Sequence, residues 1–192
     1  MLKGETMYAI SDVLDGFRHP YKIGRELNLL YHRRLRTRDY NHDGVGIFAE
    51  DWDNLLLLDA CRYDEFERLW DSTGILEHRI SRGSSSNEFV RGNFRGRELF
   101  DTVCVTANPW YLNVDGVQVH AMIPLVGEEY RDEETGAIMP ETVSKHAKKA
   151  AEEYPNKRLV VHYMQPHTPY IGPTGCEHFD GFRTRSDLAQ NN

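Results

Sequence analysis

The sequence lacks long hydrophobic runs, paired cysteines and any excess of basic residues. No stretch approaches the roughly eighteen apolar residues that a membrane-spanning helix needs, so we expect no integral membrane segment. Residues 1–10 contain Lys3 and Glu5 and no apolar core, so no secretory signal is expected. The 3 cysteines are far apart and form no CxxC pair, which argues against a disulfide framework or a structural zinc site. Reduced thiols favour a cytoplasmic location.

The charge balance is acidic. The 192 residues include 30 acidic and 23 basic side chains, for a formal net charge of −7. Surfaces that bind nucleic acid are strongly basic because they neutralise phosphates, so no nucleic-acid partner is expected. Hydrophobic residues make up 40% of the chain, which is typical of a globular protein, and the length suits one domain with a core.

Three segments are expected along the chain. Residues 1–45 form an N-terminal helical extension, in which Leu27, Leu30 and Tyr31 mark one apolar stripe of a helix over residues 10–40. Residues 46–185 form an α/β domain, and residues 186–192 form a polar tail. No strand signal follows Tyr170, so we expect the sheet to be truncated at its C-terminal side.

Apolar runs alternate with helical patterns in the central segment. Strands are predicted over residues 53–59, 102–106 and 158–163, and helices over 63–70 and 141–154. This alternation predicts a mainly parallel sheet flanked by helices. Residues 114–136 are acidic, and we expect them to form a loop-rich surface excursion.

The first chemical motif is an acid at the end of the most apolar strand. Asp59 follows four leucines, and ligands of such sheets bind at the carboxyl ends of parallel strands. A carboxylate there could hold a divalent cation, because hard oxygen ligands suit such ions. It could equally cap the following helix, as Asp readily does. Arg62 could pair with Asp64 or hold an anion through its planar guanidinium group.

The second motif is Gly83 followed by Ser84, Ser85 and Ser86. A helix that starts here would offer backbone N–H groups to an anionic ester, and one of the hydroxyls could be a nucleophile. The alternative is structural, because the spacing of Ser85 and Glu88 is that of a capping box.

The third motif places His167 between Pro166 and Pro169, just after a predicted strand. The prolines hold the loop extended, and an imidazole in this frame can donate to a substrate oxygen or bind metal. His162 lies inside the strand, and we expect it to be a packed residue.

In this order and spacing, Asp59, the Gly83–Ser–Ser–Ser turn and the Pro–His–Thr–Pro segment resemble the alkaline phosphatase/sulfatase superfamily, over about residues 51–173. The sequence of these motifs is most similar to sulfatase-like proteins of halophilic archaea, and it resembles only the N-terminal portion of the family pattern. The resemblance implies an alkaline-phosphatase-like fold and a divalent ion (Zn, Mn, Mg or Ca) bound by Asp59. It also implies that Ser84, Ser85 or Ser86 is the nucleophile, with Ser85 favoured. His167 would contact a substrate oxygen, and Arg62 would support the anion.

Two departures from the family pattern limit what the resemblance implies. The serines are not followed by the Pro and Arg of formylglycine sulfatases, which favours a plain hydroxyl nucleophile. No Asp–His dipeptide occurs in the chain, so the family's second metal-binding segment has no match. We therefore expect a metal-dependent hydrolase or phosphotransferase of a small phosphate or sulfate ester, inactive where that segment is absent. The alternative is a non-catalytic anion-binding or scaffold protein that keeps the fold.

Overall fold

The computed structural model describes Tyr31 and residues 39–178. The chain divides into two compact units, residues 1–39 and 40–192, and the second carries the elements below. Most of the expected N-terminal helix and the whole polar tail lie outside the described residues. Among the helices that are described, none has the length and apolarity to cross a membrane.

The centre of the second unit is a parallel sheet of 4 strands in the order β1-β4-β2-β3. The strands are β1 (Asn54–Leu58), β2 (Glu98–Thr106), β3 (Gln118–Pro124) and β4 (Arg158–Tyr163). Helices flank this sheet, so the predicted α/β architecture is confirmed.

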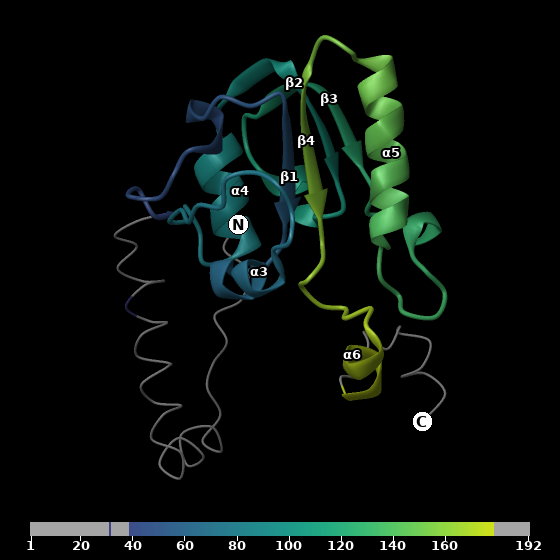
Figure 1. Ribbon diagram of the computed structural model, residues 1–192. Helices are drawn as coiled ribbons and strands as arrows, with labels where there is room; N and C mark the ends of the chain where they lie inside the picture. The colour runs from purple at the N-terminus through teal and green to yellow at the C-terminus, as the bar shows by residue number, and fades with distance from the viewer. Residues whose placement is uncertain (1–30, 32–38, 179–192) are drawn as a thin grey trace, which may run out of the picture. The chain divides into compact units, whose positions relative to one another are not determined.

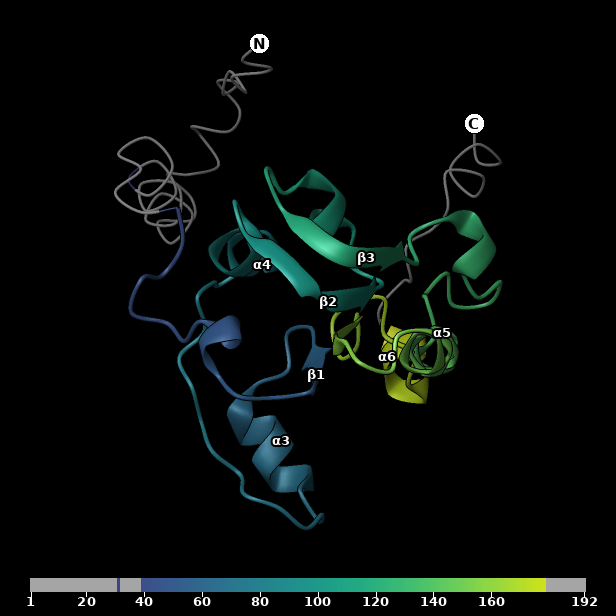
Figure 2. The same cartoon turned by 90° about the horizontal axis from the view of Figure 1, so that it is seen from above.

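Two helices cover opposite faces of the sheet (Figure 2). α5 (Pro140–Glu153) presents Val143, Ala147 and Ala150 to one face. α4 (Ser86–Phe94) presents Val90 and Phe94 to the other. The remaining helices are α3 (Tyr63–Leu69), which buries no residue, α6 (Pro173–His178), and the 3-10 turns η1 (Ile47–Ala49), η2 (Pro109–Asn113) and η3 (Glu128–Tyr130).

The edge strand β1 is covered unequally on its two faces. Leu55 and Leu57 are partly buried against the cluster that includes α4. Leu56 pairs in register with Val161 of β4, on the face of α5, yet its side chain is 58% exposed. Neighbours in register share a face, so α5 covers β4 and β2 but leaves β1 open.

The expectation of a loop-rich excursion over residues 114–136 is wrong. This segment contains β3, which pairs in parallel with β2, and Leu125, which is fully buried. The strand was missed because its sequence, QVHAMIP, mixes polar and apolar residues without a clean period. β1 is also an edge strand but was predicted, because it contains a run of four leucines.

The carboxyl ends of the parallel strands all point toward the same side of the sheet, where α3 and α6 lie (Figure 1). Residues that follow the strands there come from distant parts of the chain. This end of the sheet brings together the polar side chains described next.

Candidate functional site

Asp59 and Ser86 form the centre of a polar cluster at the strand ends. The Ser86 hydroxyl lies 3.0 Å from Oδ1 and 2.9 Å from Oδ2 of Asp59. Asp59 directly follows β1 and is 9% exposed, and Ser86 is the first residue of α4. At this distance the carboxylate accepts a hydrogen bond from the hydroxyl, so Asp59 orients the serine side chain.

The turn after Asp59 has an unusual backbone. Ala60 has a φ of 61°, in the left-handed region that non-glycine residues rarely adopt. The backbone N–H of Cys61 donates to the carbonyl of Leu58 at 3.3 Å and closes the turn. The chain thus turns immediately after β1, and Asp59 lies at the carboxyl end of that strand.

Asn108, just after β2, holds the same carboxylate. Its Nδ2 donates to Oδ2 of Asp59 at 2.7 Å, and its Oδ1 accepts from the backbone N–H of Trp110 at 3.0 Å. Its own backbone N–H donates to the hydroxyl of Thr106 at 3.0 Å. The amide is 1% exposed and is held at both ends, so it fixes one oxygen of the carboxylate.

His162 of β4 faces Asp59 from the sheet itself. Its Nε2 lies 3.6 Å from Oδ2 of Asp59, and its Nδ1 lies 3.0 Å from the hydroxyl of Tyr111. The imidazole is 3% exposed, as expected for a packed residue. Burial lowers the pKa of His162 well below its ordinary value of 6.5, and the nearby Asp59 carboxylate opposes that shift. Burial raises the pKa of Tyr111, so the phenol keeps its proton.

The other two serines of the turn cap the helix. The Ser85 hydroxyl accepts from the backbone N–H of Glu88 at 3.4 Å, which is the capping interaction expected from the spacing. The Glu88 carboxylate accepts from both the backbone N–H and the hydroxyl of Ser84, at 2.9 and 2.8 Å. Of the three candidate nucleophiles, Ser86 is therefore the one that the structure places on Asp59.

Arg62 and His167 lie on a second, exposed feature. They line a hollow of about 560 Å³ together with Leu58, Phe66 and Tyr170, and neither Asp59 nor Ser86 lines it. Arg62 donates to Asp64 at 2.8 and 2.6 Å.

His167 reaches Asp59 through the main chain. Its backbone N–H donates to the Asp59 carbonyl at 3.0 Å. Its exposed ring lies 2.8 Å from the carbonyl of Thr168. The structure therefore places Asp59 and Ser86 in contact, whereas His167 contacts Asp59 through its backbone and its side chain lines the hollow.

The donors near Asp59 do not fit a complete divalent-metal site. Asp59 and His162 supply one carboxylate and one imidazole, whereas catalytic sites of this kind use about three protein ligands or more. Within residue 31 and residues 39–178, no three His, Cys, Asp or Glu side chains are grouped to hold an ion. The side-chain oxygen of Asn108 is also occupied, because it caps η2. A metal at Asp59 would need ligands from elsewhere.

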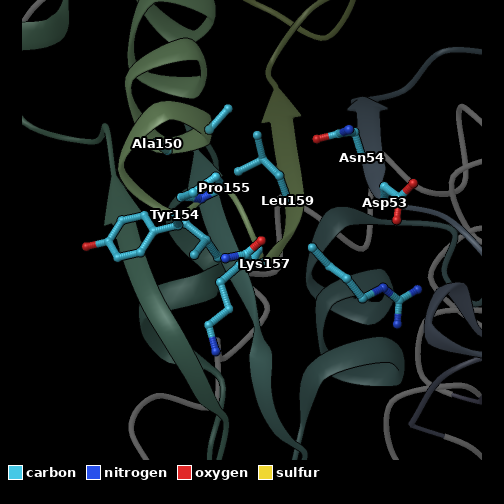
Figure 3. A pocket seen from close by; sticks show the side chains of 11 residues that line it. Asp53, Asn54, Ala150, Tyr154, Pro155, Lys157 and Leu159 are labelled. Atoms are coloured by element: carbon cyan, nitrogen blue, oxygen red, sulfur yellow. The ribbon is translucent and has the colours of Figure 1, made fainter.

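Another hollow, of about 500 Å³, lies at the opposite end of the sheet, where Tyr154, Pro155 and Lys157 precede β4 and Asp53 precedes β1 (Figure 3). Its cations are already engaged. Lys157 donates to the carbonyl of Phe100 at 2.9 Å, and the Arg158 guanidinium lies 3.8 Å from the ring centre of Trp52. Parallel sheets bind ligands at the carboxyl ends of their strands, so we place the candidate site at Asp59.

Sequence reasoning missed Asn108 and Tyr111 and treated His162 as packing alone. Asn108 is the second residue after the predicted strand 102–106, so the strand-end rule that selected Asp59 could have selected it. Tyr111 carries no comparable signal, because its contact with His162 joins residues 51 positions apart.

Comparisons of the chain with protein-family models, with curated proteins and with solved structures found no match. The functional interpretation therefore depends on the residues and on their geometry.

Proposed function

We propose that the chain carries the nucleophile of a phosphate- or sulfate-ester hydrolase or phosphotransferase, and that this nucleophile is Ser86. One observation carries this proposal: the Ser86 hydroxyl lies within hydrogen-bonding distance of both carboxylate oxygens of Asp59, at the first turn of a helix. Serine is a weak nucleophile unless a base or a metal ion activates it. We assign the role of that base to Asp59, on the strength of its contact with the Ser86 hydroxyl.

The start of α4 supports an anionic substrate. The first backbone N–H groups of a helix have no partner within it, and the helix dipole favours negative charge there. Ser85 and Glu88 satisfy the N–H groups of Glu88 and Ser84, and these contacts keep the helix start in place. A transferring phosphoryl or sulfuryl group on Ser86 would lie against this end of the helix.

The proposed reaction has two steps. Ser86 Oγ attacks phosphorus, the Oγ–P bond forms, and the P–O bond to the alcohol breaks, with its electron pair leaving on the alcohol oxygen. The proton passes from Ser86 to Asp59 and on to the departing oxygen. Water then attacks the phosphoserine, releases inorganic phosphate and restores Ser86; an acceptor alcohol in its place gives transfer. A sulfate ester reacts in the same way at sulfur.

The test compares the three serines one at a time. Turnover of p-nitrophenyl phosphate and p-nitrophenyl sulfate is measured for the full chain, with and without added manganese or zinc, and for the Ser84→Ala, Ser85→Ala and Ser86→Ala variants. We expect Ser86→Ala to reduce turnover at least about a hundredfold, since loss of a nucleophile is among the largest single effects on kcat. A matched activity of Ser86→Ala and the parent would overturn the assignment.

Ser85→Ala is the matched control, because it removes a hydroxyl from the adjacent position. It should cost about 1 kcal/mol in the free energy of unfolding through loss of the helix cap and should leave kcat close to that of the parent. Tight binding of phosphate without turnover by any form would instead favour a non-catalytic anion-binding protein.

A further inference from the structure

We propose that Tyr111 and His162 are positioning residues: Tyr111 donates its hydroxyl to Nδ1 of His162, and this fixes the tautomer whose Nε2–H faces Asp59. This inference deepens the proposed function and rests on it for its catalytic meaning. The hydrogen-bonding pattern itself can be measured without any turnover.

The ring of His162 is held in one orientation. It packs edge-on against Tyr111 at a centroid distance of 5.5 Å and against Phe89 of α4 at 6.3 Å. Tyr111 in turn packs edge-on against Phe94 at 4.8 Å. Rings enclosed in this way present the same two nitrogens to Tyr111 and Asp59 throughout.

A neutral imidazole has one N–H and one lone pair, and the partner of one nitrogen decides which nitrogen holds the proton. If Nδ1 donated to Tyr111, the lone pair of Nε2 would face the carboxylate at 3.6 Å, which is unfavourable in a buried site. If Tyr111 donates, an N–H faces the carboxylate. The contact is longer than a hydrogen bond, but its electrostatic sign favours the second arrangement.

The consequence lies in how the two oxygens of Asp59 are used. Oδ2 faces the amide of Asn108 at 2.7 Å and Nε2 of His162. The Ser86 hydroxyl lies 2.9 Å from Oδ2 and 3.0 Å from Oδ1, but Oδ2 already accepts the hydrogen bond from Asn108. His162 and Asn108 thus hold Oδ2, which leaves Oδ1 as the oxygen that takes the proton of Ser86.

The same arrangement bears on the metal expected from the resemblance. A histidine ligates metal through a lone pair, whereas the tautomer proposed here presents a proton to Asp59. We therefore assign to His162 an N–H that faces the carboxylate at 3.6 Å, and not the role of a second metal ligand beside Asp59.

The deciding experiment is ¹⁵N NMR of the full chain labelled at histidine, at neutral pH, with the signal of His162 assigned by its loss in His162→Gln. We expect an unprotonated Nδ1 and a protonated Nε2, and a change of that pattern in Tyr111→Phe. Tyr163→Phe is the matched control, because the Tyr163 hydroxyl contacts Ser144 and not His162, and it should leave the signal unchanged. A protonated Nδ1 in the parent chain would overturn the proposal, even if Tyr111→Phe failed to fold.

Kinetics separate this inference from the proposed function. Where the parent turns over ester, His162→Leu should lower kcat about tenfold with KM little changed, the lower end of what loss of a positioning partner costs. His162→Gln restores an N–H donor and should recover most of that loss. Equal kcat for the Leu and Gln variants would overturn the positioning role, whereas an inactive parent with the expected NMR pattern would contradict the proposed function alone.

Discussion

The buried cluster around Asp59 and the exposed hollow beside it are built in different ways. In the cluster, each side chain comes from a different element, and Asn108 and His162 are almost wholly buried. In the hollow, the side chains of Arg62 and His167 contact residues one or two positions away in the chain. Contacts between distant segments fix geometry to the fold, whereas local contacts on the surface leave side chains free to adjust. The side chains of the cluster are therefore held more rigidly than those that line the hollow.

We expect the largest loss of stability from Asp59→Ala, in the buried cluster. It removes the acceptor of the Asn108 amide and the Ser86 hydroxyl, and buried donors left unsatisfied cost about 1–3 kcal/mol. Urea denaturation measures the loss. Asp64→Ala is the control, because it also removes a carboxylate, but an exposed one that pairs with Arg62. It should change the free energy of unfolding by less than about 0.5 kcal/mol. Equal losses in the two variants would contradict the distinction.

A smaller effect is expected from pH. The unfolded chain protonates His162 near the ordinary pKa of 6.5, whereas the folded protein does so only at lower pH, because burial lowers the pKa. Unfolding therefore takes up a proton in this window, and the free energy of unfolding falls as the pH is lowered below about 6.5.

Denaturation midpoints at about pH 7.5 and pH 5.5 measure this dependence, with His162→Gln as the variant that lacks the titrating group. We expect the parent to lose more stability than the variant over this interval. The same slope in both would show that His162 is not the group responsible.

The smallest effect on stability is expected from the exposed side. Arg62→Ala and His167→Ala should each change the free energy of unfolding by less than about 0.5 kcal/mol, because exposed side chains with local partners contribute little. If the hollow binds the ester, KM should rise in these variants. Unchanged kinetics in both would separate the hollow from the reaction at Ser86.

Most of the sheet could be predicted from the sequence, because its central strands are strongly apolar. The strand over 158–163 matches β4, and the helix over 141–154 matches α5 within one residue at each end. β3 was missed because an edge strand with His120 and Pro124 shows no clear alternation. The local pattern is strong in β1, β2 and β4, which contain apolar runs, and weak in β3, where polar residues interrupt the run.

The candidate site was less accessible to sequence reasoning. Three consecutive serines at a helix start look equivalent in the sequence, but only Ser86 lies within α4, whereas Ser85 is the N-cap with an extended backbone. The capping box identified the role of Ser85 correctly. Choosing Ser86 required the position of the end of β1, 27 residues earlier in the chain.

The left-handed backbone of Ala60 has a consequence for how this edge can change. A residue in that conformation costs about 1 kcal/mol or more unless it is glycine, and β-branched side chains tolerate it least. The strain at Ala60 falls on the turn that follows Asp59, whereas the carboxylate itself is held by the Asn108 amide and the Ser86 hydroxyl. Because α3 buries no residue, substitution along it should cost little stability, whereas a valine or isoleucine at position 60 would strain the turn that joins β1 to α3.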